Sequence, residues 1–156
     1  MIESLKPIIQ SQPFFAGVSE TIIDVIVGCA ENVKITKGAH LMHEGQPANV
    51  FFLIREGRVG ISIHGAQFGA IPVETLEAGE MVGWSWLVPP YRARFDARAV
   101  EDTRALRFDG ECLRGKCEED HVTGYELLKR VSASLAQRLE SSRLQLIDVY
   151  GRAGAR

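Results

Sequence analysis

The chain has 156 residues, of which 46% are hydrophobic and 24% are charged, and its formal net charge is -2. These values are typical of one globular domain that can bury a core. A slightly acidic chain has no general attraction for nucleic acid. No apolar run has the roughly 18 residues of a membrane span, and the N-terminus lacks the pattern of a secretory signal. We therefore expect a cytoplasmic protein that does not bind membranes.

Residues 1–32 carry two short helical patterns. The first is amphipathic and ends near Pro13. In the second, Ser19 is typical of an N-cap, apolar residues recur every three or four positions from Ile22, and Gly28 ends the pattern. We expect two N-terminal helices.

Residues 33–108 have the periodicity of β-strands. Short apolar stretches alternate with glycine turns, and the strongest of them is VFFLIRE at 50–56. The segments on either side of Lys37-Gly38 predict a hairpin. Short strands at regular spacing with glycine turns favour a small barrel or jelly roll, so the predicted fold class is mainly β with flanking helices.

Residues 109–150 return to helical periodicity. Asp109 is typical of the N-cap of a short helix. Thr123 and Glu126 have the spacing of a capping box, which predicts a long helix ending near Tyr150. Residues 151–156 are expected to form a tail.

The predicted long helix carries more apolar surface than a domain of this size can cover. Its apolar residues are spaced by three and four, which places them in one stripe. Arg138 and Ser142 interrupt a strict coiled-coil seam. We expect part of the stripe to meet a second copy of the chain in a homodimer.

The three cysteines are Cys29, Cys112 and Cys117. An odd, sparse set argues against a disulfide framework, and a spacing of five does not fit a zinc knuckle. We expect reduced thiols, buried or partly exposed. A redox or iron–sulfur role is the alternative.

Histidines near a predicted turn raise the question of a metal site. His40, His43 and Glu44 lie close together in sequence, as in the metal centres of cupin-type jelly rolls. In a strand, however, residues three apart face opposite sides, which does not suit a ligand pair. The chain also lacks a nucleophile elbow. We therefore expect neither a metal nor an enzyme.

The order of these elements resembles the cyclic nucleotide-binding domain family. PFFAGVSE at 13–20 is similar to the family's N-terminal segment, FFLIREGRVGI at 51–61 to its hairpin with a turn glycine, and GE at 79–80 to the start of its phosphate-binding cassette. The resemblance covers most of residues 13–150. It implies a single domain over 1–156, built as a β-roll (a double-stranded β-helix, jelly-roll-like) with N-terminal helices and a long C-terminal helix.

The resemblance also implies a ligand site that begins at Gly79. Glu80 would accept a hydrogen bond from a ribose hydroxyl. Gly83 and Ser85 would belong to a short helical turn whose free amides and hydroxyl suit a phosphate, with Trp84 beside them. The implied ligand is a small anion such as cyclic AMP or cyclic GMP, with no other cofactor.

An arginine would pair with the cyclic phosphate through its planar fork, and Arg92 and Arg94 are the candidates. The family's arginine shares a strand face with an inward alanine two residues later. Here the apolar, inward set is Phe95, Ala97 and Ala99. Because residues two apart share a face, the inward anion position is Ala93, and Arg94 points outward. Arg92 reaches the site only if the chain bulges.

Besides a redox or metal-linked sensor, two functions remain open. The chain is either a non-catalytic regulatory module that senses a cyclic nucleotide and signals through its C-terminal helix, or a degenerate fold that has lost the nucleotide and serves in protein interaction or dimerisation. Transcription regulators of the family carry a helix-turn-helix after the long helix. Only GRAGAR follows Tyr150 here, so we expect no direct DNA binding by this chain.

Overall fold

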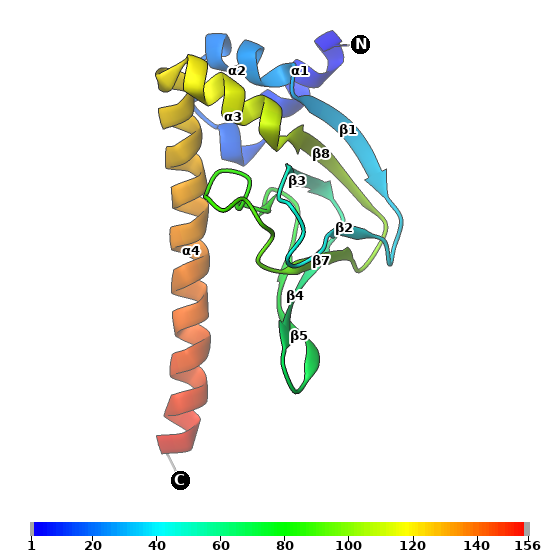
Figure 1. Cartoon of the computed structure of the whole chain (residues 1–156), viewed down its shortest axis with the longest axis vertical. Helices are drawn as coiled ribbons and strands as arrows, with labels where there is room; N and C mark the ends of the chain where they lie inside the picture. Colours follow the sequence, from blue (N-terminus) through cyan, green and yellow to red (C-terminus); the bar gives the residue numbers. More distant parts are fainter. Residues whose placement is uncertain (1, 155–156) are drawn as a thin grey trace.

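The computed structural model describes residues 2–154. Four helical segments gather at one end of a β-roll, and a fifth runs along its side (Figure 1). The helical segments are α1 (Ile2–Gln10), the 3-10 turn η1 (Pro13–Phe15), α2 (Glu20–Val27), α3 (Gly110–Glu119) and α4 (His121–Gly154). The strands are β1 (Ala30–Ile35), β2 (His40–Met42), β3 (Val50–Glu56), β4 (Val59–Gly65), β5 (Gly69–Leu76), β6 (Met81–Val82), β7 (Asp96–Ala99) and β8 (Thr103–Asp109).

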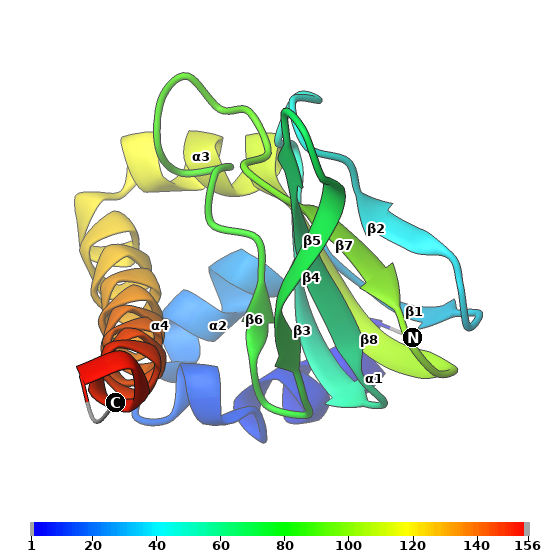
Figure 2. The same cartoon turned by 90° about the horizontal axis from the view of Figure 1, so that it is seen from below.

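The strands form two antiparallel four-stranded sheets, in the orders β1-β8-β3-β6 and β2-β7-β4-β5. The two sheets form the β-roll, and Figure 2 shows α4 standing beside it and α3 crossing above it. The predicted fold class, mainly β with N-terminal helices and a long C-terminal helix, is confirmed.

The hairpin predicted around Lys37-Gly38 is wrong. β1 pairs with β8, and β2 pairs with β7, so the two segments belong to different sheets. The turn between them is held by the β7–β8 connection, since Lys37 N donates to Asp102 Oδ1 and Gly38 N donates to Ala99 O, both at 2.8 Å. The turn therefore carries the chain from one sheet to the other.

Both faces of β3 are covered, which explains its continuous apolar sequence. Phe51 and Leu53 face the helices, in a cluster that also contains Phe108 and Leu127. Phe52 and Ile54, which alternate with them along the strand, face the interior of the roll. The predicted buried strand at 50–56 is confirmed.

The predicted helix caps are confirmed at two of three positions. Ser19 Oγ accepts a hydrogen bond from Ile22 N, and Asp109 Oδ1 accepts one from Cys112 N. The capping box at Thr123 is wrong, because α4 already begins at His121. Asp120 takes the role instead: its carboxylate accepts from Val122 N and from the buried Thr123 hydroxyl.

A disulfide joins Cys29 to Cys112, with Cα atoms 5.7 Å apart. The expectation of three reduced thiols is therefore wrong for two of them. The cause is strand pairing: β1 lies beside β8, and Asp109 N donates to Cys29 O, so the end of α2 meets the first turn of α3. Cys117 remains a thiol, and burial raises its pKa.

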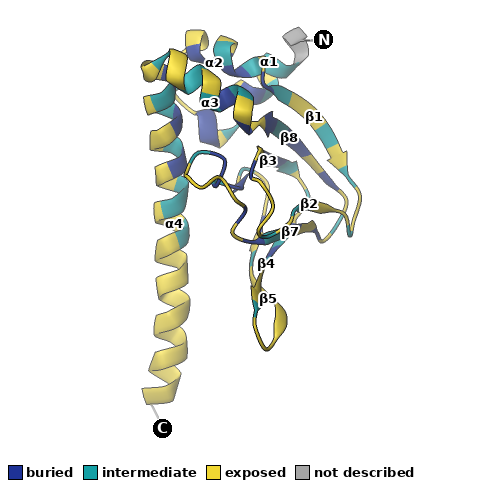
Figure 3. Cartoon of the chain, viewed as in Figure 1, coloured by how far each residue is buried: buried dark blue, intermediate teal, exposed yellow. Residues whose placement is uncertain are grey.

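Helix α4 is continuous over 34 residues. Its first half packs on the core through Thr123, Leu127 and Val131, whereas the second half is exposed (Figure 3). The predicted tail is helical as far as Gly154, and residues 155–156 lie outside the described part. Within residues 2–154, no helix is both long and apolar enough to cross a membrane.

Candidate functional site

The corner after β6 is a packed turn. Gly83 has φ +95°, and a β-carbon there would lie 2.8 Å from Met42 Cε. Residues 85–87 form a turn in which Leu87 N donates to Trp84 O at 3.2 Å. The chain therefore makes a short turn at this place, and Leu87 N and Val88 N donate within it.

The core and α3 hold this corner in place. Trp86 is fully buried and stacks on Phe51 with ring centroids 4.9 Å apart. From α3, Arg114 Nη1 donates to Trp86 O at 2.6 Å, and the same guanidinium lies 4.4 Å from the centre of the Tyr91 ring. The corner is thus fixed from both sides.

A small cavity of about 170 Å³ lies under the corner, and Gly83, Ser85 and Ala93 line it. Its other walls are mainly apolar, and His43 is its one lining residue with a basic side chain. Pockets that hold small-molecule ligands usually have volumes of about 300–1,000 Å³. This cavity is therefore small for a nucleotide.

The inward direction predicted for Ala93 is confirmed, because only 6% of its surface is exposed. Arg94 is exposed, as its strand parity predicts. Arg92 is also exposed, and its Nη1 donates to Gly45 O at 2.9 Å. Neither arginine lines the cavity under the corner.

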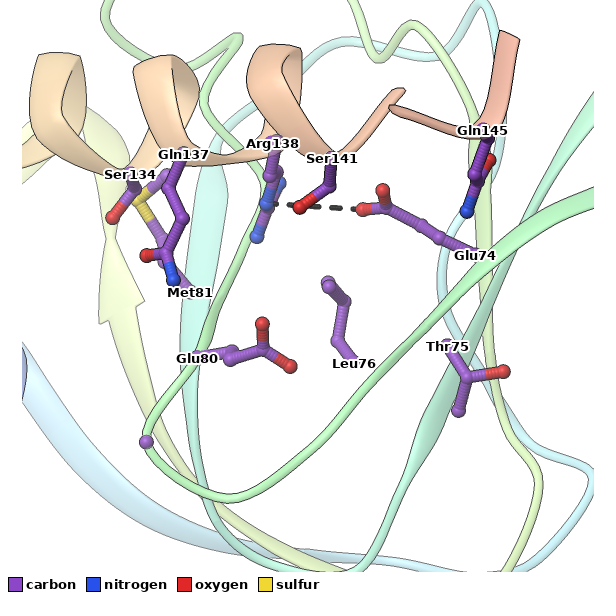
Figure 4. Close-up of a pocket in the computed structure, with 11 residues that line it drawn as sticks. Glu74, Thr75, Leu76, Glu80, Met81, Ser134, Gln137, Arg138, Ser141 and Gln145 are labelled. Carbon is purple, nitrogen blue, oxygen red and sulfur yellow. Dashed lines mark ion pairs between the residues drawn. The ribbon is translucent and has the colours of Figure 1, made fainter. Parts of the chain in front are cut away.

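Gly79 and Glu80 line a different pocket, of about 280 Å³, between the β5–β6 turn and α4 (Figure 4). Glu80 Oε2 accepts a hydrogen bond from Glu77 N at 2.6 Å, so this side chain also stabilises the turn. Its carboxylate points towards Arg138 of α4 across the pocket (Figure 4). Most of the other lining side chains are polar: Glu74, Thr75, Ser134, Gln137, Ser141 and Gln145.

Arg138 is the cation of this pocket. Its side chain is 16% exposed, and its Nε lies 3.8 Å from Glu74 Oε1. Its Nη2 is buried and has no hydrogen-bond partner among residues 2–154. Burial lowers the pKa of the guanidinium, and the negative charges of Glu74 and Glu80 oppose that shift. Sequence analysis missed this residue as a site residue, although its interruption of the apolar stripe was a signal.

Trp84 lines a third cavity, an apolar groove of about 620 Å³ between α4 and the β4–β5 hairpin. Arg138 and Glu74 line this groove as well as the polar pocket. Five of the seven residues predicted to form one site are therefore distributed over three cavities, and Arg92 and Arg94 line none of these three. Arg138 stands where two of them meet.

The histidines near the end of β2 are arranged differently from the strand geometry expected for them. β2 ends at Met42, and the rings of His40 and His43 stack with centroids 4.4 Å apart instead of facing opposite sides. His64 Nδ1 lies 3.2 Å from Glu44 Oε2. Within the described residues, no cluster of three or more histidines, cysteines and carboxylates could hold a metal ion.

The family model of the cyclic nucleotide-binding domain matches residues 32–120, more than half of the chain. The chain belongs to the cyclic nucleotide-binding domain family. It is 26% identical over 139 residues to cyclic nucleotide-gated ion channel 18 of Arabidopsis thaliana, and the match covers 88% of this chain and 19% of the channel. The chain thus spans about a fifth of the length of this relative.

Solved structures agree with this assignment at the level of the fold. A cyclic nucleotide-binding domain from Methylobacillus flagellatus superposes with a TM-score of 0.77 at 17% identity, covering 94% of this chain and 83% of that one. The regulatory domain of Toxoplasma gondii PKA, solved with cAMP, gives a TM-score of 0.69 at 15% identity, covering 90% and 50% of the two chains. The neighbours of this cyclic nucleotide-binding domain include regulatory proteins.

Proposed function

We propose that this cyclic nucleotide-binding domain is a non-catalytic regulatory module that assembles as a homodimer through α4 and has lost the cyclic phosphate site of its cassette. The observation that carries the proposal is Ala93. It occupies the inward position that the family resemblance gives to the phosphate-binding arginine, and 6% of its surface is exposed.

Charge supports the loss of the phosphate site. Burying an anion is costly unless a cation or several hydrogen-bond donors accompany it. Arg92 is exposed and donates to Gly45 O, and Arg94 is also exposed. The residues that line the cavity under the corner thus include no arginine or lysine that could pair with a cyclic phosphate.

The exposed stripe of α4 supports the dimer. Its members are spaced by seven, four, seven and four residues, which places them on one side of a helix. They are Leu128, Leu135, Leu139, Leu146 and Tyr150, all of them exposed except Leu135, which is half-buried against the core. Leu139 and Leu146 are each 54% exposed, and Tyr150 is 72% exposed. A second α4 on this stripe would cover surface that a lone chain leaves in water.

Sensing of cyclic AMP or cyclic GMP is the second candidate function. It is favoured by Glu80, the residue to which the resemblance gives the ribose hydroxyl, because this residue lines a pocket that α4 closes. In that case the nucleotide would bind beside α4 without the cassette arginine.

Sedimentation equilibrium across micromolar protein concentrations tests the dimer. Leu139→Asp should give monomers, because a carboxylate would be buried in the seam. Leu144→Asp is the matched control, since Leu144 is similarly exposed but lies about 140° around the helix from Leu139. A wild-type chain that remains monomeric, or equal effects of the two variants, would refute the proposed dimer.

Calorimetric titration with cyclic AMP and cyclic GMP separates the two candidates. The proposed loss of the phosphate site predicts no heat of binding at millimolar nucleotide. Binding that Glu80→Ala abolishes would instead favour the sensing function.

A further inference from the structure

Arg138 marks a composite cavity that is separate from the cassette corner. The polar pocket and the apolar groove share Glu74 and Arg138 in their walls. A molecule with a polar head and an apolar body could therefore occupy both at once. The chemistry of the walls specifies what that head must carry.

The three charged side chains of the pocket have a formal sum of -1. Arg138 contributes one positive charge, and Glu74 and Glu80 contribute one negative charge each. A simple anion would form an ion pair with Arg138, but the carboxylates of Glu74 and Glu80 would repel it. A simple cation would form ion pairs with the carboxylates, but Arg138 Nη2 would stay buried without a hydrogen-bond partner among the described residues. A zwitterion satisfies both requirements.

The arrangement of the charges suits two adjacent, oppositely charged groups. In Figure 4 the Glu80 carboxylate and the Arg138 guanidinium face each other across the pocket, and Glu74 approaches from the strand side. The ion pair between Arg138 and Glu74 is loose at 3.8 Å. Gln137 and Ser141 of α4 add neutral hydrogen-bonding groups on the same wall. If a ligand carboxylate pairs with Arg138, an ammonium group next to it in the ligand could therefore donate to the carboxylates of Glu80 and Glu74.

The groove specifies the apolar body. Trp84 and Phe95 come from the β-roll side, and Leu135 and Leu139 come from α4. Its volume of about 620 Å³ lies within the usual range of ligand pockets, about 300–1,000 Å³. A large aliphatic or aromatic side chain would contact both walls there.

We propose that this cavity binds an α-amino acid with a large apolar side chain. Its carboxylate pairs with Arg138, its ammonium pairs with Glu80 and Glu74, and its side chain lies in the groove between Trp84 and α4. Such a ligand bridges α4 and the β-roll, so it stabilises the arrangement in which they lie together.

Three matched probes test the head group by isothermal titration calorimetry: L-phenylalanine, 3-phenylpropanoate, which lacks the amine, and 2-phenylethylamine, which lacks the carboxylate. L-phenylalanine should bind roughly ten- to hundredfold more tightly than either analogue, as the loss of one charged hydrogen-bonding group implies. Equal binding of an analogue, or no binding of any probe at millimolar concentration, overturns the proposal.

Three variants test the residues. Arg138→Gln and Glu80→Gln should each weaken L-phenylalanine binding by roughly tenfold or more, and Gln at position 80 keeps the acceptor that stabilises the turn. Arg143→Gln is the control, because Arg143 also lies on α4 but is exposed. Thermal melts followed by circular dichroism identify a variant that has lost its fold. Binding that Arg138→Gln leaves unchanged in a folded protein overturns the assignment.

The amino-acid site and the homodimer have separate readouts, although Leu135 and Leu139 belong to both the groove and the stripe. A wild-type chain that sediments as a monomer and still binds L-phenylalanine refutes only the dimer. A dimer that gives no heat with L-phenylalanine refutes only the amino-acid site.

Discussion

Breaking the Cys29–Cys112 disulfide should lower the stability of the fold by several kcal/mol. The two cysteines are 83 residues apart in sequence, so the bond closes a long loop in the unfolded chain. The chain-entropy relation gives about 4.6 kcal/mol at 25 °C for a loop of this length, and measured values are typically about 2–4 kcal/mol. We expect Cys112→Ala to lose about 2–4 kcal/mol.

Urea unfolding followed by tryptophan fluorescence measures this loss. For an m-value of about 2 kcal/mol/M, the midpoint should fall by roughly 1–2 M. Cys117→Ala is the matched control, because Cys117 lies on the same helix but is not in the bond. All samples need one protomer concentration, since dimer formation also shifts the midpoint.

A reducing agent provides a second measurement on the unaltered protein. The wild type should lose stability when a dithiol reductant is added, and Cys112→Ala should not. Coincident wild-type curves with and without reductant, together with three titratable thiols in the unreduced protein, would show that the cross-link does not form.

Three further changes have defined outcomes. Ala93→Arg restores a cation under the corner, so cyclic AMP should raise the melting temperature of this variant more than that of the wild type; a folded variant without such a shift would refute the role given to this position. Gly57→Ala should lower the melting temperature by several degrees, because φ is +105° and the new carbon would lie 2.5 Å from Thr103 Oγ1. A hydrogen bond from the Thr123 hydroxyl lowers the pKa of Asp120. A lowered folded-state pKa gives stability that is present above the unfolded value of about 3.9 and is lost as the pH falls through the folded value. Asp120→Asn should therefore be less stable than the wild type near pH 7, and melting curves should converge in acid; a constant difference would contradict this.

The fold could be predicted from local patterns because its strands and helices differ clearly in periodicity. VFFLIRE at 50–56 and the caps at Ser19 and Asp109 carry information within a few residues of themselves. The Lys37-Gly38 turn misled the prediction because its partners, Ala99 and Asp102, are distant in sequence. Local pattern cannot distinguish a turn within a sheet from a turn between sheets.

The candidate site was less predictable than the fold. Strand parity correctly placed Ala93 inside, because alternation is a local property. Arg138 is different, because its role depends on Glu74, a residue on β5 that is distant in sequence but close in space. The same limit applies to the disulfide, which strand pairing creates and cysteine counting cannot reveal.

Because α4 is long, a small rotation at its first turn moves its far end by a large distance. At 1.5 Å per residue, its 34 residues extend for about 51 Å. A tilt of about 10° at its first turn would swing the far end by roughly 9 Å. The buried side chains of Thr123, Leu127 and Val131 anchor the beginning of the helix on the core. Any adjustment there too small to disturb the β-roll would thus be magnified into a large displacement at Gly154.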